Sequence, residues 1–252
     1  MNHRARRIPV LLLSRRGLVK SVRFQDHSYI GDYLNAARLF SDLGADELIV
    51  LDIDASPSGR TIDPEIVTRI ADEISMPLSV GGGIGRIDSV TDLIAAGAEK
   101  VVLCTGAWRD PYLIKDAAER HGSSAVCVCI DAKIRPSGEQ TVHVVGGFED
   151  TDLTPVDFAK LAEEHGAGEI VLQSIDRDGL MSGYDIELVS KVSQAVSVPV
   201  VALGGAGSIA DMAAVVDRGY ASAAAAGSMF VYFGPHKGVL INYPPPEASV
   251  IC

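Results

Sequence analysis

GADELIV at residues 44–50 returns at residues 166–172 as GAGEIVL, and the offset of 122 positions is kept over a much longer stretch. At the same offset, the glycine cluster GGIG at 82–85 returns as GGAG at 204–207. Each copy opens with an apolar run rich in branched residues, continues through a helical pattern and reaches a second apolar run that ends in glycines. We interpret this pattern as one βαβα unit that the chain uses twice.

Two such units, each enlarged by one strand and one helix at its start, give eight strands and close a barrel. The chain has 252 residues, which is typical of such a barrel, and its apolar fraction of 47% is enough for a buried core. We therefore predict an α/β protein, a single (β/α)8 TIM barrel over residues 1–252. Its half-barrels span about residues 1–122 and 123–252, and they must complete one another because the repeat is far longer than that of a solenoid.

The expected strands are continuous apolar runs, as in a parallel sheet that is buried on both faces. They lie near residues 8–13, 47–53, 77–81, 100–104, 125–131, 169–174, 198–203 and 222–226. Helical patterns lie between them, at residues 33–43, 64–74, 87–96, 111–120, 155–165, 186–195 and 209–218. Two longer connections, 14–30 and 133–153, follow the first and fifth strands. Because chemistry in this fold occurs at the C-terminal ends of the strands, we expect these insertions to be lids over the catalytic face, the second as a loop or small hairpin.

Charge and composition exclude several classes of partner. The net charge of −11 argues against nucleic acid and anionic membranes. The first apolar run ends at Leu13, too soon for a signal sequence, and no stretch of 18 apolar residues is present, so we expect a soluble, cytoplasmic protein. Cys127 and Cys129 form a C-x-C on one face of a strand; we favour packing over metal binding, because no second Cys or His cluster completes a site. We predict no metal and no cofactor.

Two glycine-rich turns are candidate anion sites. GGG at 81–83 and GGAG at 204–207 follow the third and seventh strands, where the absence of Cβ atoms lets backbone N–H groups approach an anion. Thr105 and Ser228 follow the fourth and eighth strands and begin helices whose first N–H groups attract phosphate. Their pairing through the repeat predicts a substrate with a phosphate at each end, although such glycines could also serve only to make tight turns.

Carboxylates lie at the same ends of the predicted strands. Asp131 ends the fifth strand, Asp52 and Asp54 end the second, and Asp176 and Asp178 follow the sixth. Carboxylates above a phosphate-lined bowl are typical of proton transfer on a sugar phosphate. We favour catalysis for Asp131, and we favour bracing of loops or capping of helices for Asp54 and Asp176.

These residues together resemble the cyclase subunit of imidazole glycerol phosphate synthase. The resemblance covers about residues 5–233, and its most specific part, SIDRDG at 174–179 followed by SGYD at 182–185, favours the cyclase over the phosphoribosyl isomerase of the same pathway. The other matching segments are RI at 7–8, VK at 19–20, LDID at 51–54, GGGI at 81–84, IDAK at 130–133, GAGEI at 166–170 and GGAG at 204–207. The resemblance implies histidine-biosynthesis chemistry, in which ammonia from a glutaminase subunit under the barrel passes along its axis to cleave and cyclise a two-phosphate ribulosyl substrate.

The resemblance also assigns roles to individual residues. It makes Asp131 the retained catalytic aspartate. The residues expected to bind the substrate and its phosphates are Lys20, Gly82, Gly83, Thr105, Asp178, Gly179, Gly204, Gly205, Gly227 and Ser228. The residues expected to form a charged ammonia gate at the N-terminal mouth are Arg7, Glu47, Lys100 and Glu169. Four charges inside a barrel are costly unless they pair into a ring, and such a ring could instead be a simple plug.

The sequence departs from the family at several of these places. The aspartate that ends the family's first strand is replaced by Leu13, and a leucine cannot supply the 10²–10⁴-fold that general acid or base catalysis typically gives. Cys104 stands for the family's asparagine and Gln173 for its threonine. The segment 234–252 is too short and too rich in proline for the family's eighth helix.

Three functional hypotheses follow from these losses. In the first, the chain is a cyclase-type subunit that keeps its reaction, and Asp52 or Lys20 takes over from the missing carboxylate. In the second, a paralogue without cyclase activity conducts ammonia from the glutaminase to a nucleotide-sugar amidotransferase in surface-polysaccharide synthesis. In the third, a non-catalytic barrel only activates its glutaminase partner.

Overall fold

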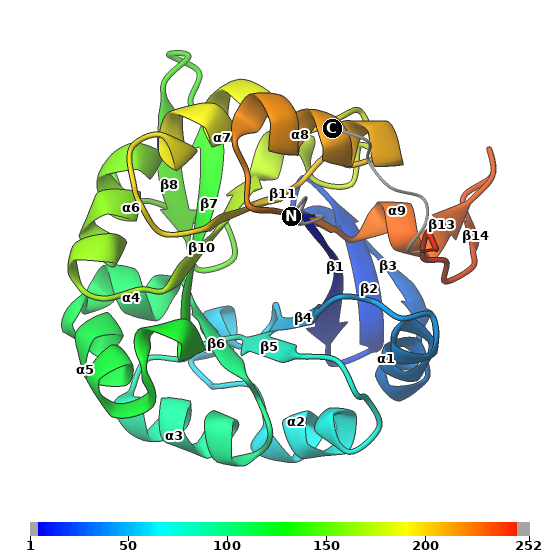
Figure 1. Ribbon diagram of the computed structural model, residues 1–252, viewed down its shortest axis with the longest axis horizontal. Helices are drawn as coiled ribbons and strands as arrows, with labels where there is room; N and C mark the ends of the chain where they lie inside the picture. The colour runs from blue at the N-terminus through cyan, green and yellow to red at the C-terminus, as the bar shows by residue number, and fades with distance from the viewer. Residues whose placement is uncertain (1–4, 246–252) are drawn as a thin grey trace.

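The apolar runs form a closed ring of parallel strands in the computed structural model, which describes residues 5–245 (Figure 1). The barrel strands are β1 (Arg6–Ser14), β4 (Leu48–Asp52), β5 (Leu78–Gly81), β6 (Lys100–Leu103), β7 (Val126–Ile134), β10 (Glu169–Ser174), β11 (Val200–Leu203) and β12 (Ala223–Ala226). Parallel pairing of β12 with β1 closes the ring. The predicted (β/α)8 barrel and its eight strands are confirmed, although β1 begins two residues earlier than expected.

Helices between the strands surround the barrel in Figure 1. The seven predicted helices are α1 (Tyr33–Asp42), α2 (Pro64–Ala71), α3 (Ile87–Ala95), α5 (Tyr112–His121), α6 (Pro155–Glu164), α7 (Ile186–Ser193) and α8 (Ile209–Gly219). Shorter pieces are α4 (Thr105–Arg109), α9 (Ser228–Val231), η1 (Ser56–Ser58), η2 (Ser123–Ala125) and η3 (Ile175–Arg177). The repeat is visible in the caps, because Asp63 and Asp185 accept hydrogen bonds at the starts of α2 and α7. Within residues 5–245, no helix is long and apolar enough to cross a membrane.

Alternating side chains of the strands fill two separate cores. The outer core lies between strands and helices and includes Leu13, Phe40, Phe158 and Phe230. The inner core fills the barrel itself, with Ile8, Val10, Ile49, Val102, Cys127, Cys129, Val171, Val201, Leu203, Ala223 and Ala225. Cys127 and Cys129 are free thiols within this core, as predicted for the C-x-C sequence.

Both predicted insertions form antiparallel hairpins at the C-terminal ends of barrel strands. The first consists of β2 (Gly17–Val22) and β3 (Gln25–Gly31), and the second joins β7 to β8 (Gln140–Val144) and β9 (Glu149–Asp150). The two insertions meet where Gly147 packs against the ring of Phe24. They are therefore placed where lids would lie, and their role as lids remains a prediction.

The chain after β12 replaces the eighth helix with a short hairpin. The four-residue α9 leads into β13 (Tyr232–Phe233) and β14 (Gly238–Val239), shown in orange at the edge of Figure 1. Tyr243 then returns to the barrel, where its ring packs against Phe230 at a centroid distance of 5.3 Å and its hydroxyl donates to the Arg7 carbonyl at 2.9 Å. The expected loss of the eighth helix holds for residues 234–245, and residues 246–252 lie outside the described part.

Candidate functional site

A cavity of about 280 Å³ opens at the C-terminal mouth of the barrel, beneath the two hairpins. Inward-facing strand residues form its base, and the hairpins contribute Phe24, His27 and Phe148. Its base is mostly apolar, with Leu12, Leu51, Val102, Cys104, Cys129, Asp131 and Gln173. A site of this kind holds a small molecule and excludes water from most of its surface.

Asp131, the predicted catalytic residue, lies in this cavity and is only 8% exposed. Cys129 Sγ donates to Oδ1 at 3.4 Å, and Cys104 Sγ donates to Oδ2 at 3.6 Å. Burial raises the pKa of Asp131 to about 6, while the two thiols favour the charged form and oppose this rise. A carboxyl with a pKa near neutrality can both release and accept a proton, as general acid–base catalysis requires.

The other strand-end carboxylates have structural partners. Asp52 lines the cavity, and the two terminal guanidinium nitrogens of Arg60 each donate to one of its carboxylate oxygens. Asp54 accepts from the backbone N–H of Arg15, and its repeat equivalent Asp176 accepts from the backbone N–H of Ile134, at 2.9 and 2.8 Å. The prediction that Asp54 and Asp176 brace loops is therefore confirmed.

The predicted substrate-binding residues fall into two groups. Gly82, Gly83 and Thr105 line the cavity together with Asp131. The remaining seven are absent from its lining: Lys20, Asp178, Gly179, Gly204, Gly205, Gly227 and Ser228. Gly83 has φ +62°, and a Cβ there would collide with the Arg60 carbonyl, so backbone geometry alone already requires this glycine. Phosphate binding by either group remains a prediction.

Lys20 and Asp178 link the second group to the first hairpin. Burial lowers the pKa of Lys20 to about 8, against the attraction of Asp178, and its ammonium donates to the Val10 carbonyl at 2.6 Å beside Gly227. Burial also raises the pKa of Asp178, although its carboxylate accepts from Ser21 Oγ at 2.7 Å. A protonated lysine beside backbone glycine is suited to an anion, and Lys20 keeps mostly this form at neutral pH.

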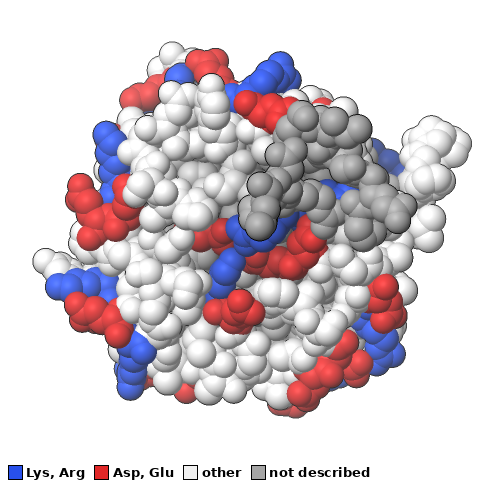
Figure 2. All heavy atoms as spheres, in the orientation of Figure 1, with Lys and Arg blue, Asp and Glu red and all other residues white. Residues whose placement is uncertain are grey.

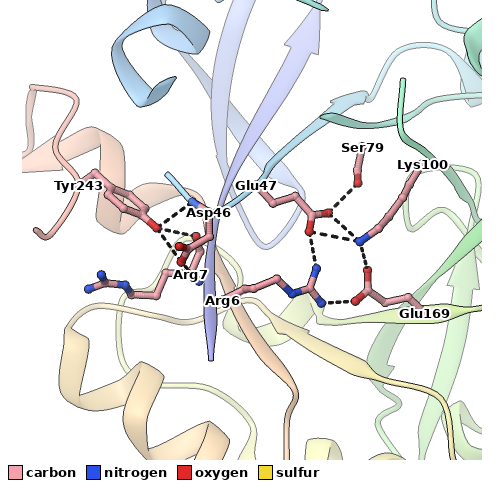
Figure 3. A network of polar contacts seen from close by, with 8 residues as sticks. All are labelled: Arg6, Arg7, Asp46, Glu47, Ser79, Lys100, Glu169 and Tyr243. Carbon is pink, nitrogen blue, oxygen red and sulfur yellow. Dashed lines mark hydrogen bonds and ion pairs between the residues drawn. The ribbon is translucent and has the colours of Figure 1, made fainter. Parts of the chain in front are cut away.

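Charged side chains form a closed ring at the opposite, N-terminal mouth of the barrel (Figure 3). Arg6 pairs with both Glu47 and Glu169, and Lys100 pairs with the same two carboxylates, at 3.2 and 2.8 Å. Ser79 donates a further hydrogen bond to Glu47 at 2.7 Å. Alternating charges offset the cost of burying each of them. We call Arg6, Glu47, Lys100 and Glu169 the charged ring; Figure 2 shows blue and red side chains at the centre of this face.

The arginine of the charged ring is Arg6, so the prediction of Arg7 was wrong. Side chains on a strand alternate between its faces, and Arg7 therefore points away from the barrel axis. Figure 3 shows it on the far side of β1, where its guanidinium lies 5.4 Å from the ring centre of Tyr243. The predicted Glu47, Lys100 and Glu169 do come together.

The same one-residue shift changes which leucine replaces the missing aspartate. Leu12 lines the cavity, whereas Leu13 is buried in the outer core with 4% exposure. The prediction that Leu13 takes the place of the catalytic carboxylate was therefore wrong in position. Because both residues are leucines, the conclusion that β1 brings no carboxylate to the cavity is unchanged.

A thin apolar layer separates the charged ring from the cavity. On β6, Lys100 belongs to the ring and Val102, the next inward residue, already lines the cavity. Glu47 immediately precedes β4, and on the inward face only Ile49 lies between it and Leu51. At about 3.3 Å of rise per residue, the ring lies roughly 7–13 Å along the strands from the cavity base. The layer between them consists of aliphatic side chains and the buried thiol of Cys127.

Several site residues could not be found from the sequence. Phe24, His27 and Phe148 lie in hairpins whose pairing has no clear sequence signal. Arg60, the partner of Asp52, lies in the loop between η1 and α2. Cys129 is different, because its spacing of two from Asp131 on one strand places both side chains on the same face. Among residues 5–245, no group of three or more His, Cys, Asp or Glu side chains could hold a metal ion.

Comparisons with known proteins match this chain to one family over almost its whole length. A family model described as "Histidine biosynthesis protein" matches residues 6–237. The "Putative imidazole glycerol phosphate synthase subunit hisF3" of Vibrio vulnificus is 44% identical over 245 residues, which are 97% of this chain and 94% of that protein. The corresponding hisF2 protein of Pseudomonas aeruginosa, with the same description, is 44% identical and covers 96% of both chains. The "Imidazole glycerol phosphate synthase subunit HisF" of Alkaliphilus metalliredigens is 44% identical and covers 89% of both.

Proposed function

This chain belongs to the histidine biosynthesis protein family, and on that premise we propose that it is the cyclase-type subunit of a glutamine amidotransferase complex resembling imidazole glycerol phosphate synthase. In this proposal a glutaminase subunit docks on the N-terminal face of the barrel, in the cytoplasm, and ammonia enters through the charged ring. The cavity at the other end holds a two-phosphate ribulosyl substrate, which is cleaved and cyclised with that ammonia.

The observation that carries this proposal is the placement of two sites at opposite ends of one barrel. The charged ring surrounds the N-terminal mouth, and the Asp131 carboxyl lies in the cavity at the C-terminal mouth. The apolar layer between them would pass neutral ammonia but oppose an ammonium ion, because burying an unpaired charge is costly. Ala223 and Ala225 on β12 are the smallest side chains of the inner core, and we propose that the route passes beside them.

Asp131 is the group that we propose transfers the proton. Its pKa of about 6 keeps it mostly ionised at neutral pH, so that it can act first as a base. Gly82, Gly83 and Thr105 at the cavity rim would hold one phosphate, and Gly204, Gly205, Gly227 and Ser228 the other, aided by Lys20. The net attraction of an anionic substrate must come from these local groups because the whole chain has a charge of −11.

A second candidate function, without cyclisation, is favoured by one observation: Leu12 lines the cavity at the place where the family has a carboxylate. A cyclase that has lost one of two proton-transfer groups would be slowed by about 10²–10⁴-fold. Asp52 could replace it only by leaving Arg60, and Lys20 does not line the cavity. The chain would then conduct ammonia from the glutaminase to a separate sugar amidotransferase, or would only activate the glutaminase.

Turnover with ammonium salt separates these functions without any partner. The purified protein is mixed with the two-phosphate ribulosyl substrate and ammonium chloride, and formation of the imidazole product is followed. We expect turnover that Asp131→Asn abolishes and that Asp176→Asn, a change in a loop-bracing carboxylate, largely keeps. No product with the wild-type protein at any ammonium concentration would reject the cyclase function and leave ammonia conduction or activation.

A further inference from the structure

Two thiols are the hydrogen-bond donors to Asp131. Cys104 follows β6 and Cys129 lies within β7, and their Sγ atoms reach different oxygens of the same carboxylate, at 3.6 and 3.4 Å. Within residues 5–245, no arginine, lysine or backbone N–H donates to this carboxylate. The register of β6 and β7, which pairs Leu103 with Val128, brings Cys104 and Cys129 side by side above the inner core.

We propose that Cys104 and Cys129 are positioning residues for Asp131, each holding one carboxylate oxygen through a thiol hydrogen bond. The proposal deepens the proposed function, since it concerns how the cavity presents its acid–base group. Neither thiol needs to touch the substrate for this role. The arrangement fixes both oxygens on β7, so that the carboxylate cannot rotate freely in the cavity.

The chemistry of the thiol explains why this pair suits an acid–base residue. Burial raises the pKa of both thiols well above the usual value, so both remain protonated donors at neutral pH. A thiol is a weaker donor than a hydroxyl or an ammonium group. It can therefore orient the carboxylate without stabilising its charged form so strongly that the carboxyl would no longer accept a proton.

Other titratable groups around Asp131 must be distinguished from the thiols. Asp178, which follows η3, raises the pKa of Asp131 by charge repulsion. His143 pairs with Asp131 across the β7–β8 ladder, and its ring contacts the Gly147 carbonyl and Asp150 instead. The remaining titratable groups that line the same cavity are His27, Asp52 and Asp54.

The test is a titration of the Asp131 side-chain carboxyl by carbon NMR, with the signal assigned from Asp131→Asn. Removing a donor with Cys104→Ala or Cys129→Ala should raise the apparent pKa by about half a pH unit or more. Replacing it by a stronger donor with Cys104→Ser or Cys129→Ser should lower the apparent pKa. Cys127→Ala and Cys127→Ser are matched controls on the same face of β7, where Cys127 makes no contact with Asp131, and they should leave the titration unchanged.

Opposite shifts for alanine and serine would not arise from a general loss of packing, because both residues are smaller than cysteine. Thermal denaturation of each variant checks that the titration is measured on folded protein. An unchanged Asp131 titration in the folded Cys104→Ala/Cys129→Ala protein would overturn the proposal, and so would shifts of the same sign for alanine and serine. The titration needs no turnover, so failure of the cyclase reaction would leave this result readable.

Discussion

At the scale of the residue, Asp131 is costly for the fold because its buried carboxylate has no cationic partner among residues 5–245. Its pKa is raised from 3.8 to about 6 on folding, so the folded state binds the proton more tightly than the unfolded state. The loss of folding free energy caused by the buried charge is therefore complete above pH 6, shrinks as the pH falls from 6 towards 4, and is absent below pH 4. Such costs are common where stability is given up for activity.

We expect Asp131→Asn to stabilise the protein at pH 7.5 by up to about 2–3 kcal/mol, because the amide carries no charge. The difference from wild type should disappear near pH 4, and urea denaturation at both pH values measures it. Asp116→Asn is the control, since Asp116 is exposed on α5 and should show no pH-dependent gain. An equal gain for Asp131→Asn at pH 4 and pH 7.5 would contradict the raised pKa.

At the scale of the element, the phase of β1 decides which side chains reach the barrel axis. Leu12 lines the cavity and Leu13 packs in the outer core. We expect Leu12→Asp to fold and to raise ammonium-dependent cyclisation by about 10²-fold, because it returns a proton-transfer group to the cavity. Leu13→Asp should instead lose several kcal/mol of stability, because it buries an unpaired charge among apolar side chains.

Urea denaturation and the cyclisation rate, measured on both variants, test this assignment. Leu12→Asn is the matched control for activity, because asparagine is similar to aspartate in size and polarity but has no carboxyl group to transfer a proton. If Leu13→Asp folded normally and gained activity, the phase of β1 would be opposite to the one described.

The C-terminal segment is a second element with a measurable contribution. Tyr243 packs on Phe230, and its hydroxyl bonds to the Arg7 carbonyl and contacts Asp46 in place of an eighth helix. Tyr243→Phe keeps the ring contact and should cost about 1 kcal/mol in the free energy of unfolding, whereas Tyr243→Ala should cost about 3 kcal/mol or more. Tyr220→Phe, at an exposed tyrosine, is the control. Equal losses for the two Tyr243 variants would mean that the ring contributes nothing.

The sequence predicted elements far better than it predicted the phase within one of them. Most of the eight barrel strands appear as runs of branched residues, and the seven helices appear as helical patterns between them. β12 is four alanines, Ala223–Ala226, and has no such run, so its place comes from the repeat. In contrast, RRIPVLLLS in β1 contains two consecutive arginines and three consecutive leucines, so a period of two has no starting point. The sequence analysis therefore named Arg7 and Leu13 where the structure has Arg6 in the charged ring and Leu12 in the cavity. Contacts between distant hairpins, such as that of Gly147 with Phe24, depend on tertiary packing and leave no local pattern.

At the scale of the whole molecule, the charged ring and the cavity share one barrel interior, and the proposed function requires ammonia to cross it. Two consecutive arginines on β1 allow this to be tested with a matched pair, because Arg6 belongs to the charged ring and Arg7 packs on Tyr243 outside the barrel. Changes in the ring alter the mouth of the barrel, while a change at Arg7 alters its contacts with Tyr243 and with the Pro245 carbonyl on the outer side of β1.

In the complex with its glutaminase, we expect Lys100→Met and Arg6→Met to uncouple the two reactions, so that glutamine is hydrolysed but the ammonia is not incorporated. Either change leaves Glu47 and Glu169 with one cation instead of two, and the ring no longer closes. The measurement is the ratio of product formed to glutamine hydrolysed, taken at saturating partner. Arg7→Met should lower the thermal stability and keep this ratio at the wild-type value. If all three variants kept that ratio, ammonia would not enter through the charged ring, and the ring would act only as a plug for the barrel.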